Sequence, residues 1–160
     1  MADNDSGDPN ARALAILRIS VGLLFLIFAE YKIVGTEFTG HGFQFWISKF
    51  IEQGSYPFML PVLRGFVLPH GKLIAFLVAY GELAIGLALV LGFLVRIASI
   101  FGLIFMLALL FSSDYPGAGA AFWEYFGTSL SHSVLALCFI AFLLGRADAV
   151  WSVRISFIHK

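Results

Sequence analysis

Residues 71–94 constrain the fold more than any other stretch, because they form an almost unbroken apolar run with one acidic side chain, Glu82, near the middle. As an α-helix, a segment of this length extends about 36 Å, enough to cross the roughly 30 Å hydrocarbon core of a membrane. A carboxylate at mid-membrane is costly unless it is protonated or paired. We therefore predict a transmembrane helix in which Glu82 faces protein and has a polar partner.

The composition extends this interpretation to the whole chain. Of its 160 residues, 60% are apolar and 12% are charged, whereas soluble domains average roughly 45–50% and 25%. The 10 basic and 10 acidic side chains cancel, so the chain lacks the basic surface that nucleic-acid binding requires. The single cysteine, Cys138, excludes a disulfide or a redox-active dithiol within the chain. The first partner we expect is therefore the lipid bilayer.

Four apolar stretches are long enough, or nearly so, to cross a bilayer as helices. They are residues 11–34, 71–94, 97–113 and 128–144. We therefore predict an all-α fold, a polytopic membrane four-helix bundle. One domain, residues 11–148, is expected to hold the four spans, between a flexible acidic tail at 1–10 and a C-terminal tail at 149–160.

The connection between the first two spans, residues 35–70, contains glycines, prolines and charges that could not cross lipid as a loop. Within residues 43–51, apolar side chains recur at helical spacing and polar side chains occupy the opposite face. An aromatic-rich helix of this kind favours the membrane surface. We predict an amphipathic interfacial helix between helices 1 and 2.

An even number of spans places both termini on one side of the membrane. Arg and Lys are more frequent in cytoplasmic loops than in outer loops. The cations on the side of the termini are Arg12, Arg18, Arg96, Arg146, Arg154 and Lys160, and those on the other side are Lys32, Lys49, Arg64 and Lys72. The excess on the first side predicts a multi-pass protein of the bacterial inner (plasma) membrane with cytoplasmic termini.

Three ionisable side chains fall near one another when the midpoints of the predicted helices are set level. By helix rise, Arg18 then lies about 7 Å to the cytoplasmic side of Glu82, and His132 about 6 Å to the outer side. Lys32 lies about 14 Å from Glu82 along the axis, so a contact between them would need an unusual tilt. We predict an axial ladder of Arg18, Glu82 and His132. Near its outer mouth we expect Lys32, Glu30 and His70.

Two interpretations of this ladder remain open. A buried ion pair can fix the register of the helices without any chemistry. Alternatively, intramembrane charges mark a polar cavity for a quinone headgroup, an anion or a proton. The four histidines have neither the spacing nor the depth for bis-His haem ligation. We therefore predict no metal or haem cofactor.

Two stretches resemble the signatures of a known family. Residues 17–32 (LRISVGLLFLIFAEYK) resemble the first-helix signature of the DoxX and DoxD-like membrane proteins, in which an Arg is followed by Gly, Phe and a final Lys. Residues 81–99 (GELAIGLALVLGFLVRIAS) are similar to the second-helix signature, with its Glu, its glycines and a closing Arg. The ending with Gly145, Arg146 and Asp148 fits as well.

The resemblance implies a small four-helix integral membrane protein. The family is named for quinone-linked, thiosulfate-oxidising subunits, and other members resemble accessory or scaffold subunits of redox enzymes. Carried over by position, the resemblance points to Arg18, Lys32, Glu82 and Arg96. No cysteine is placed for sulfur transfer and no cofactor motif is present, so the resemblance does not establish thiosulfate oxidation by this chain.

Two functions fit these observations best, and a third, transport of a small anion or a proton, is limited by the absence of broken-helix repeats. In the first, the protein is a membrane subunit of a quinone-linked oxidoreductase, in which Glu82 and His132 handle protons and Arg18 or Lys32 stabilises reduced or anionic species. In the alternative, it is a non-catalytic accessory or scaffold subunit that stabilises a larger respiratory or photosynthetic complex, or it forms a homo-oligomer. The sequence contains no self-sufficient catalytic motif for either function, so the question whether the protein is an enzyme stays open. The candidates for ligand binding or proton handling are Arg18, Lys32, Glu82 and His132, with Glu30, His70 and Arg96 as secondary candidates.

Overall fold

The computed structural model describes residues 8–153, and the prediction of an all-α fold is confirmed for this part of the chain. The four long helices are α1 (Pro9–Val34), α4 (Gly71–Leu91), α5 (Val95–Ser112) and α7 (Leu130–Leu144). Shorter elements connect them: η2 (Phe38–Gly42), α2 (Phe43–Gln53), α3 (Leu60–Val62), η3 (Leu63–Val67) and α6 (Glu124–Gly127), where η denotes a π-helical turn. The outer parts of the predicted tails, with Arg154, His159 and Lys160, lie outside the described residues.

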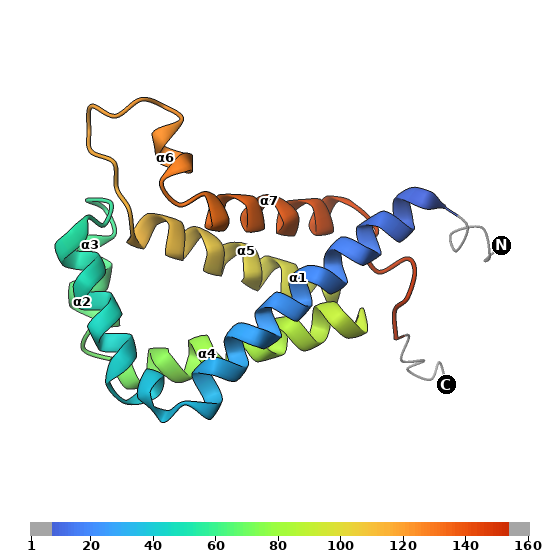
Figure 1. Cartoon of the computed structure of the whole chain (residues 1–160), viewed down its shortest axis with the longest axis horizontal. Helices are drawn as coiled ribbons and strands as arrows, with labels where there is room; N and C mark the ends of the chain where they lie inside the picture. The colour runs from blue at the N-terminus through green and yellow to red at the C-terminus, as the bar shows by residue number, and fades with distance from the viewer. Residues whose placement is uncertain (1–7, 154–160) are drawn as a thin grey trace, which may run out of the picture.

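The long helices pack as two antiparallel pairs, α1 with α4 and α5 with α7, and a tight turn joins α4 to α5 (Figure 1). The start of α1 and the segment that follows α7 lie at one end of the helices, which we call the terminal end (Figure 1). Helices α2, α3 and α6 lie at the opposite end, which we call the loop end.

Three of the long helices, α1, α4 and α5, are long and apolar enough to cross a membrane. Helix α7 is also apolar but has 15 residues. This length corresponds to about 22 Å of helix, which is less than the hydrocarbon thickness of about 30 Å. The prediction of a membrane protein is confirmed, and a crossing is supported for three of the four predicted spans.

Helix α4 ends earlier than predicted because the chain turns sharply at Gly92. This residue has φ 71° and donates its N–H to carbonyl oxygens in the last turn of α4, the usual role of glycine in the left-handed conformation after a helix. Leu94 also has a positive φ, 51°. The two positive φ angles reverse the chain, so α4 ends at Leu91 rather than at 94 and α5 begins at Val95 rather than at 97.

Helices α1 and α4 cross where Gly22 faces Gly86. A Cβ atom added to Gly22 would lie 2.9 Å from Leu89 Cβ and 3.0 Å from the carbonyl oxygen of Gly86. Likewise, a Cβ atom on Gly86 would lie 3.0 Å from the carbonyl oxygen of Gly22. The two backbones therefore touch directly, as small residues allow in membrane helices. This contact fixes the register of α1 against α4.

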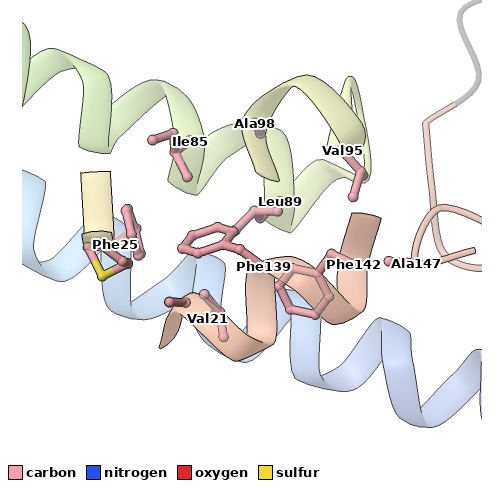
Figure 2. Close-up of a cluster of buried hydrophobic side chains, with 11 residues drawn as sticks. Val21, Phe25, Ile85, Leu89, Val95, Ala98, Phe139, Phe142 and Ala147 are labelled. Carbon is pink, nitrogen blue, oxygen red and sulfur yellow. The ribbon is translucent and has the colours of Figure 1, made fainter. Parts of the chain in front are cut away.

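The main hydrophobic core joins the two helix pairs (Figure 2). Phe139 of α7 is completely buried and makes an edge-to-face contact with Phe25 of α1, with ring centroids 5.4 Å apart. Its ring also packs on Gly102 of α5, where a Cβ atom would lie 2.3 Å from the ring. The other labelled side chains of this core are Val21, Ile85, Leu89, Val95, Ala98, Phe142 and Ala147.

A second core lies at the loop end and holds α2 and η3 against α4. Phe43 and Ile47 of α2 are buried there with Leu63 and Ala75. The opposite side of α2 is exposed and includes Phe45 and Glu52. The predicted amphipathic helix is confirmed as α2, and its location in a membrane interface stays a prediction.

Candidate functional site

Glu82 has its predicted polar partner, and that partner is Lys32. Lys32 Nζ donates to Glu82 Oε1 in a salt bridge between α1 and α4. The two side chains are only 16% and 6% exposed. Lys32 Nζ also lies 5.3 Å from the centroid of the Phe38 ring and 6.0 Å from that of Phe105, within the range of cation–π attraction.

The predicted contact between Arg18 and Glu82 is wrong, and the register of the helices explains why. The prediction set residues 21–23 level with Glu82, whereas the crossing places Gly22 level with Gly86. Measured from this crossing toward the loop end, Glu82 lies about 6 Å along its helix and Lys32 about 15 Å along its own. The remaining distance of about 9 Å can be spanned by the long lysine stem together with the glutamate side chain.

Arg18 instead lies at the terminal end, where it holds the segment that follows α7. Its side chain is completely buried, and Nη2 donates to the carbonyl oxygens of Trp151 at 2.8 Å and Val150 at 3.5 Å. The absence of a Cβ on Gly92 leaves space for this guanidinium, because a Cβ there would lie 2.2 Å from Nη1. Arg18 is therefore a link between α1 and residues 150–151.

A cavity of about 230 Å³, which we call the ion-pair cavity, brings together three of the four main candidates. Its polar lining consists of Lys32, Glu82, Ser131 and His132. The remaining lining residues are apolar and come from α1, α5 and α7: Leu24, Phe25, Phe28, Met106, Leu109 and Leu135. The structure thus places a cation, a carboxylate and an imidazole around one partly open cavity between the long helices.

A second cavity of about 430 Å³, which we call the apolar cavity, lies between α4, α5 and the loop-end elements α2 and η3. Its walls are rich in aromatic side chains, among them Phe43, Phe50, Phe66 and Phe101. Among the described residues that line it, Glu82 is the one with a charged side chain. Glu82 and Leu109 line both cavities, so the carboxylate lies where the two volumes meet.

Glu82 has unused hydrogen-bonding capacity. Oε1 accepts from Lys32, but Oε2 is buried and has no hydrogen-bond partner within the structure. A buried acceptor without a partner costs about 1–3 kcal/mol. A ligand that donates a hydrogen bond to Oε2 would recover this cost, so this atom is an indication of a binding site.

His132 is held by two residues that sequence analysis missed. Its Nδ1 lies 2.9 Å from Ser129 Oγ, and Ser129 Oγ donates to Asp114 Oδ2 at 3.0 Å. The spacing of Ser129 and His132 was a usable signal, since residues three apart face each other on a helix. Asp114 could not be found this way, because a long connection separates it from α7.

The secondary candidates do not line the ion-pair cavity. Glu30 is exposed on α1. His70 is exposed at the loop end, with Nδ1 2.8 Å from the carbonyl oxygen of Phe66. Arg96 is exposed at the terminal end, where it lines a polar depression together with Arg146 and Asp148. Within residues 8–153, no group of three or more His, Cys, Asp or Glu side chains could hold a metal ion.

Comparison with protein families matches residues 13–113 to DoxX. The matched region runs from α1 through α5 and contains Arg18, Lys32, Glu82 and Arg96, while His132 lies beyond it. No match was found among curated proteins or among solved structures. The match covers well over half of the chain, and the protein is therefore a member of the DoxX family.

Proposed function

We propose that this protein binds a membrane quinone and works as the membrane subunit of a quinone-linked redox complex. The observation that carries the proposal is the place of Glu82, a buried carboxylate with one unpartnered oxygen that lines both the ion-pair cavity and the apolar cavity. A quinone likewise has a polar part and an apolar part, because a ring with two carbonyl acceptors is joined to a long isoprenoid tail. Ligand sites typically combine an apolar lining with a few placed polar groups.

In this proposal the ion-pair cavity receives the headgroup and the apolar cavity receives the tail. Lys32 Nζ, which already donates to Glu82, is the donor available to a ring carbonyl. Glu82 Oε2 and His132 accept hydrogen bonds from ring hydroxyls after reduction. When bound, the quinone supplies a carrier of two electrons and two protons. The electrons are exchanged with a redox centre of the partner complex.

The topology is part of the same proposal. Helix α7 crosses the membrane together with the residues that flank it, so that both chain ends face the cytoplasm. The excess of Arg and Lys near the terminal end, including Arg12, Arg96 and Arg146, supports this orientation. The protein then belongs to the inner membrane, with α2 lying along the outer surface.

An accessory role without quinone is the second candidate. Phe122 and Trp123 are 81% and 69% exposed beside α6, outside the long helices. Exposed aromatic side chains are enriched where proteins bind one another. A large partner complex could therefore dock at the loop end, with the charges between the helices serving only to hold their register.

Copurification in mild detergent separates the two functions. We expect lipid extracts of the purified full-length chain to contain quinone, and those of the Glu82→Gln variant to contain little. Glu30→Gln is the matched control, because Glu30 is exposed and lines neither cavity. A stoichiometric partner complex that accompanies both variants equally, with no quinone in any extract, would support the accessory role instead.

A further inference from the structure

A chain of hydrogen-bonded side chains leads from the ion-pair cavity to the surface at the loop end. His132 lines the cavity, Ser129 is buried at 5% exposure, and Asp114 is exposed. The two hydrogen bonds that join them are 2.9 and 3.0 Å long. A continuous series of hydrogen-bonded side chains therefore connects the ion-pair cavity to water.

The direction of these hydrogen bonds is determined by chemistry. The hydroxyl of Ser129 has one proton, which it donates to the carboxylate of Asp114. Ser129 Oγ must then accept from His132, so Nδ1 of the imidazole carries its proton. In a neutral imidazole with Nδ1 protonated, Nε2 is an acceptor. The ring can therefore take a proton from the cavity at Nε2.

The side chain of Ser129 does not serve as a helix cap. Ser129 occupies the position before α7 where a serine usually caps the helix, but its side chain makes no capping hydrogen bond. Asp114 has φ 55°, and its carbonyl oxygen accepts from Thr128 Oγ1 at 2.9 Å. With this left-handed backbone conformation, the Asp114 carboxylate lies within hydrogen-bond distance of Ser129. Asp is among the residues that tolerate this conformation.

We propose that His132, Ser129 and Asp114 form a proton-release path from the ion-pair cavity to the loop end. The path rests on the proposed function, because oxidation of a bound quinol would supply its protons. A proton from the cavity forms a new N–H bond at Nε2, and the Nδ1–H bond breaks as its proton passes to Ser129 Oγ. The former hydroxyl proton of Ser129 forms an O–H bond with Asp114 Oδ2 and then leaves to water. The transfer leaves the imidazole neutral with its proton on Nε2, and Ser129 with a new hydroxyl proton.

Glu82 and Lys32 are the other ionisable groups that line the cavity beside His132. A volume of about 230 Å³ with these polar neighbours can also hold ordered water. Protons can thus reach Nε2 from Glu82 through such water. Helix α5 contributes two apolar side chains to the cavity, Met106 and Leu109. The lining from this helix therefore holds no ionisable group that could take the proton in place of His132.

Solid-state NMR of the full chain with nitrogen-15-labelled histidine, in lipid bilayers, tests the path without any ligand. The His132 signal is identified by its loss in His132→Gln. We expect the Nδ1–H tautomer in the wild type. Exchange of this ring proton with D₂O should slow in Ser129→Ala and in Asp114→Asn, because each substitution removes a proton-carrying group from the path. Ser133→Ala is the control, because Ser133 donates to Phe126 outside the path.

The Nε2–H tautomer in the wild type, or unchanged exchange in both variants, would overturn the path. Binding of decylubiquinone, measured on the same preparations, separates this failure from failure of the proposed function. Ser129 and Asp114 do not line the ion-pair cavity, so their variants should retain saturable quinone binding, although the hydrogen bonds that hold His132 are altered. If the wild type binds no decylubiquinone, the proposed function fails, and the NMR result still decides whether the proton path exists.

Discussion

Lys32 and Glu82 form an ion pair across α1 and α4, toward the loop end from the point where Gly22 and Gly86 bring the two backbones into contact. Each partner is nearly out of solvent. Charges in such a place are stable only while they are paired, because the surroundings do not solvate either one alone. The same pair therefore lines the ion-pair cavity and stabilises the packing of α1 against α4.

Removing one member of this pair should destabilise the protein more than removing both. Glu82→Gln or Lys32→Met leaves one buried charge alone, at an expected cost of about 3–5 kcal/mol, and the double variant should recover part of it. Unfolding of the purified protein in detergent gives the double-mutant cycle. Arg18→Met and Glu82→Gln should be additive, because Arg18 has other partners. Coupling of Glu82 to Arg18 rather than to Lys32 would contradict the observed register.

Gly22→Ala should be destabilising although alanine is the better helix former. The added methyl group would lie 2.9 Å from Leu89 Cβ, and overpacking of this kind costs about 1–3 kcal/mol. Gly81→Ala in α4 is the matched control, because a Cβ there meets nothing within 4 Å. The control should gain up to about 1 kcal/mol from helix propensity. Equal effects of the two substitutions on thermal unfolding would argue against the close crossing.

Arg18→Met should loosen the segment that follows α7 while the ion-pair cavity stays intact. The Val153 N–H donates to the carbonyl oxygen of Leu91 at 2.9 Å, next to the carbonyls that Arg18 holds. Loss of a hydrogen bond to a charged donor should speed hydrogen exchange at Val153 roughly 10- to 100-fold. Arg96→Met, at the same end but exposed, should leave the exchange rate unchanged. Wild-type protection in Arg18→Met would show that the arginine does not hold this segment.

Cysteine labelling can decide whether α7 crosses the membrane. In a Cys138→Ala background, we expect Glu52→Cys and Ala118→Cys to react from one side, and Asn10→Cys and Asp148→Cys from the other. These four positions are exposed, unlike Ser55, which is buried and donates to the carbonyl oxygen of Ser112 at 2.6 Å. Labelling of Asp148→Cys from the same side as Ala118→Cys would show that α7 does not cross.

Sequence patterns were sufficient for the helices and for the need of Glu82 to have a partner, because both follow from local composition and from the cost of a buried charge. They were insufficient for the identity of that partner. The prediction places the midpoints of the helices level, whereas the contact between Gly22 and Gly86 sets the register of α1 against α4. A shift of one helical turn between α1 and α4 makes Lys32, rather than Arg18, the partner of Glu82. Hydropathy alone does not reveal such a shift.

The same limit applies to the surroundings of His132. Its position one turn into the last helix could be predicted, and the structure places it in the cavity with Glu82. Its contact with Ser129 and, through it, with Asp114 depends on how residues 113–129 fold back over the loop end. Nothing in the local pattern of that connection determines the path of its backbone.

The most direct test of the proposed site is titration of the purified full-length protein with decylubiquinone. We predict saturable binding by the wild type and by Glu30→Gln, whose side chain is exposed outside both cavities. Glu82→Gln and His132→Ala should each weaken binding roughly tenfold or more, as expected for loss of one buried hydrogen bond to the ligand. Equal affinity in all four proteins, or no saturable binding by the wild type, would contradict the proposal that Glu82 marks a quinone site.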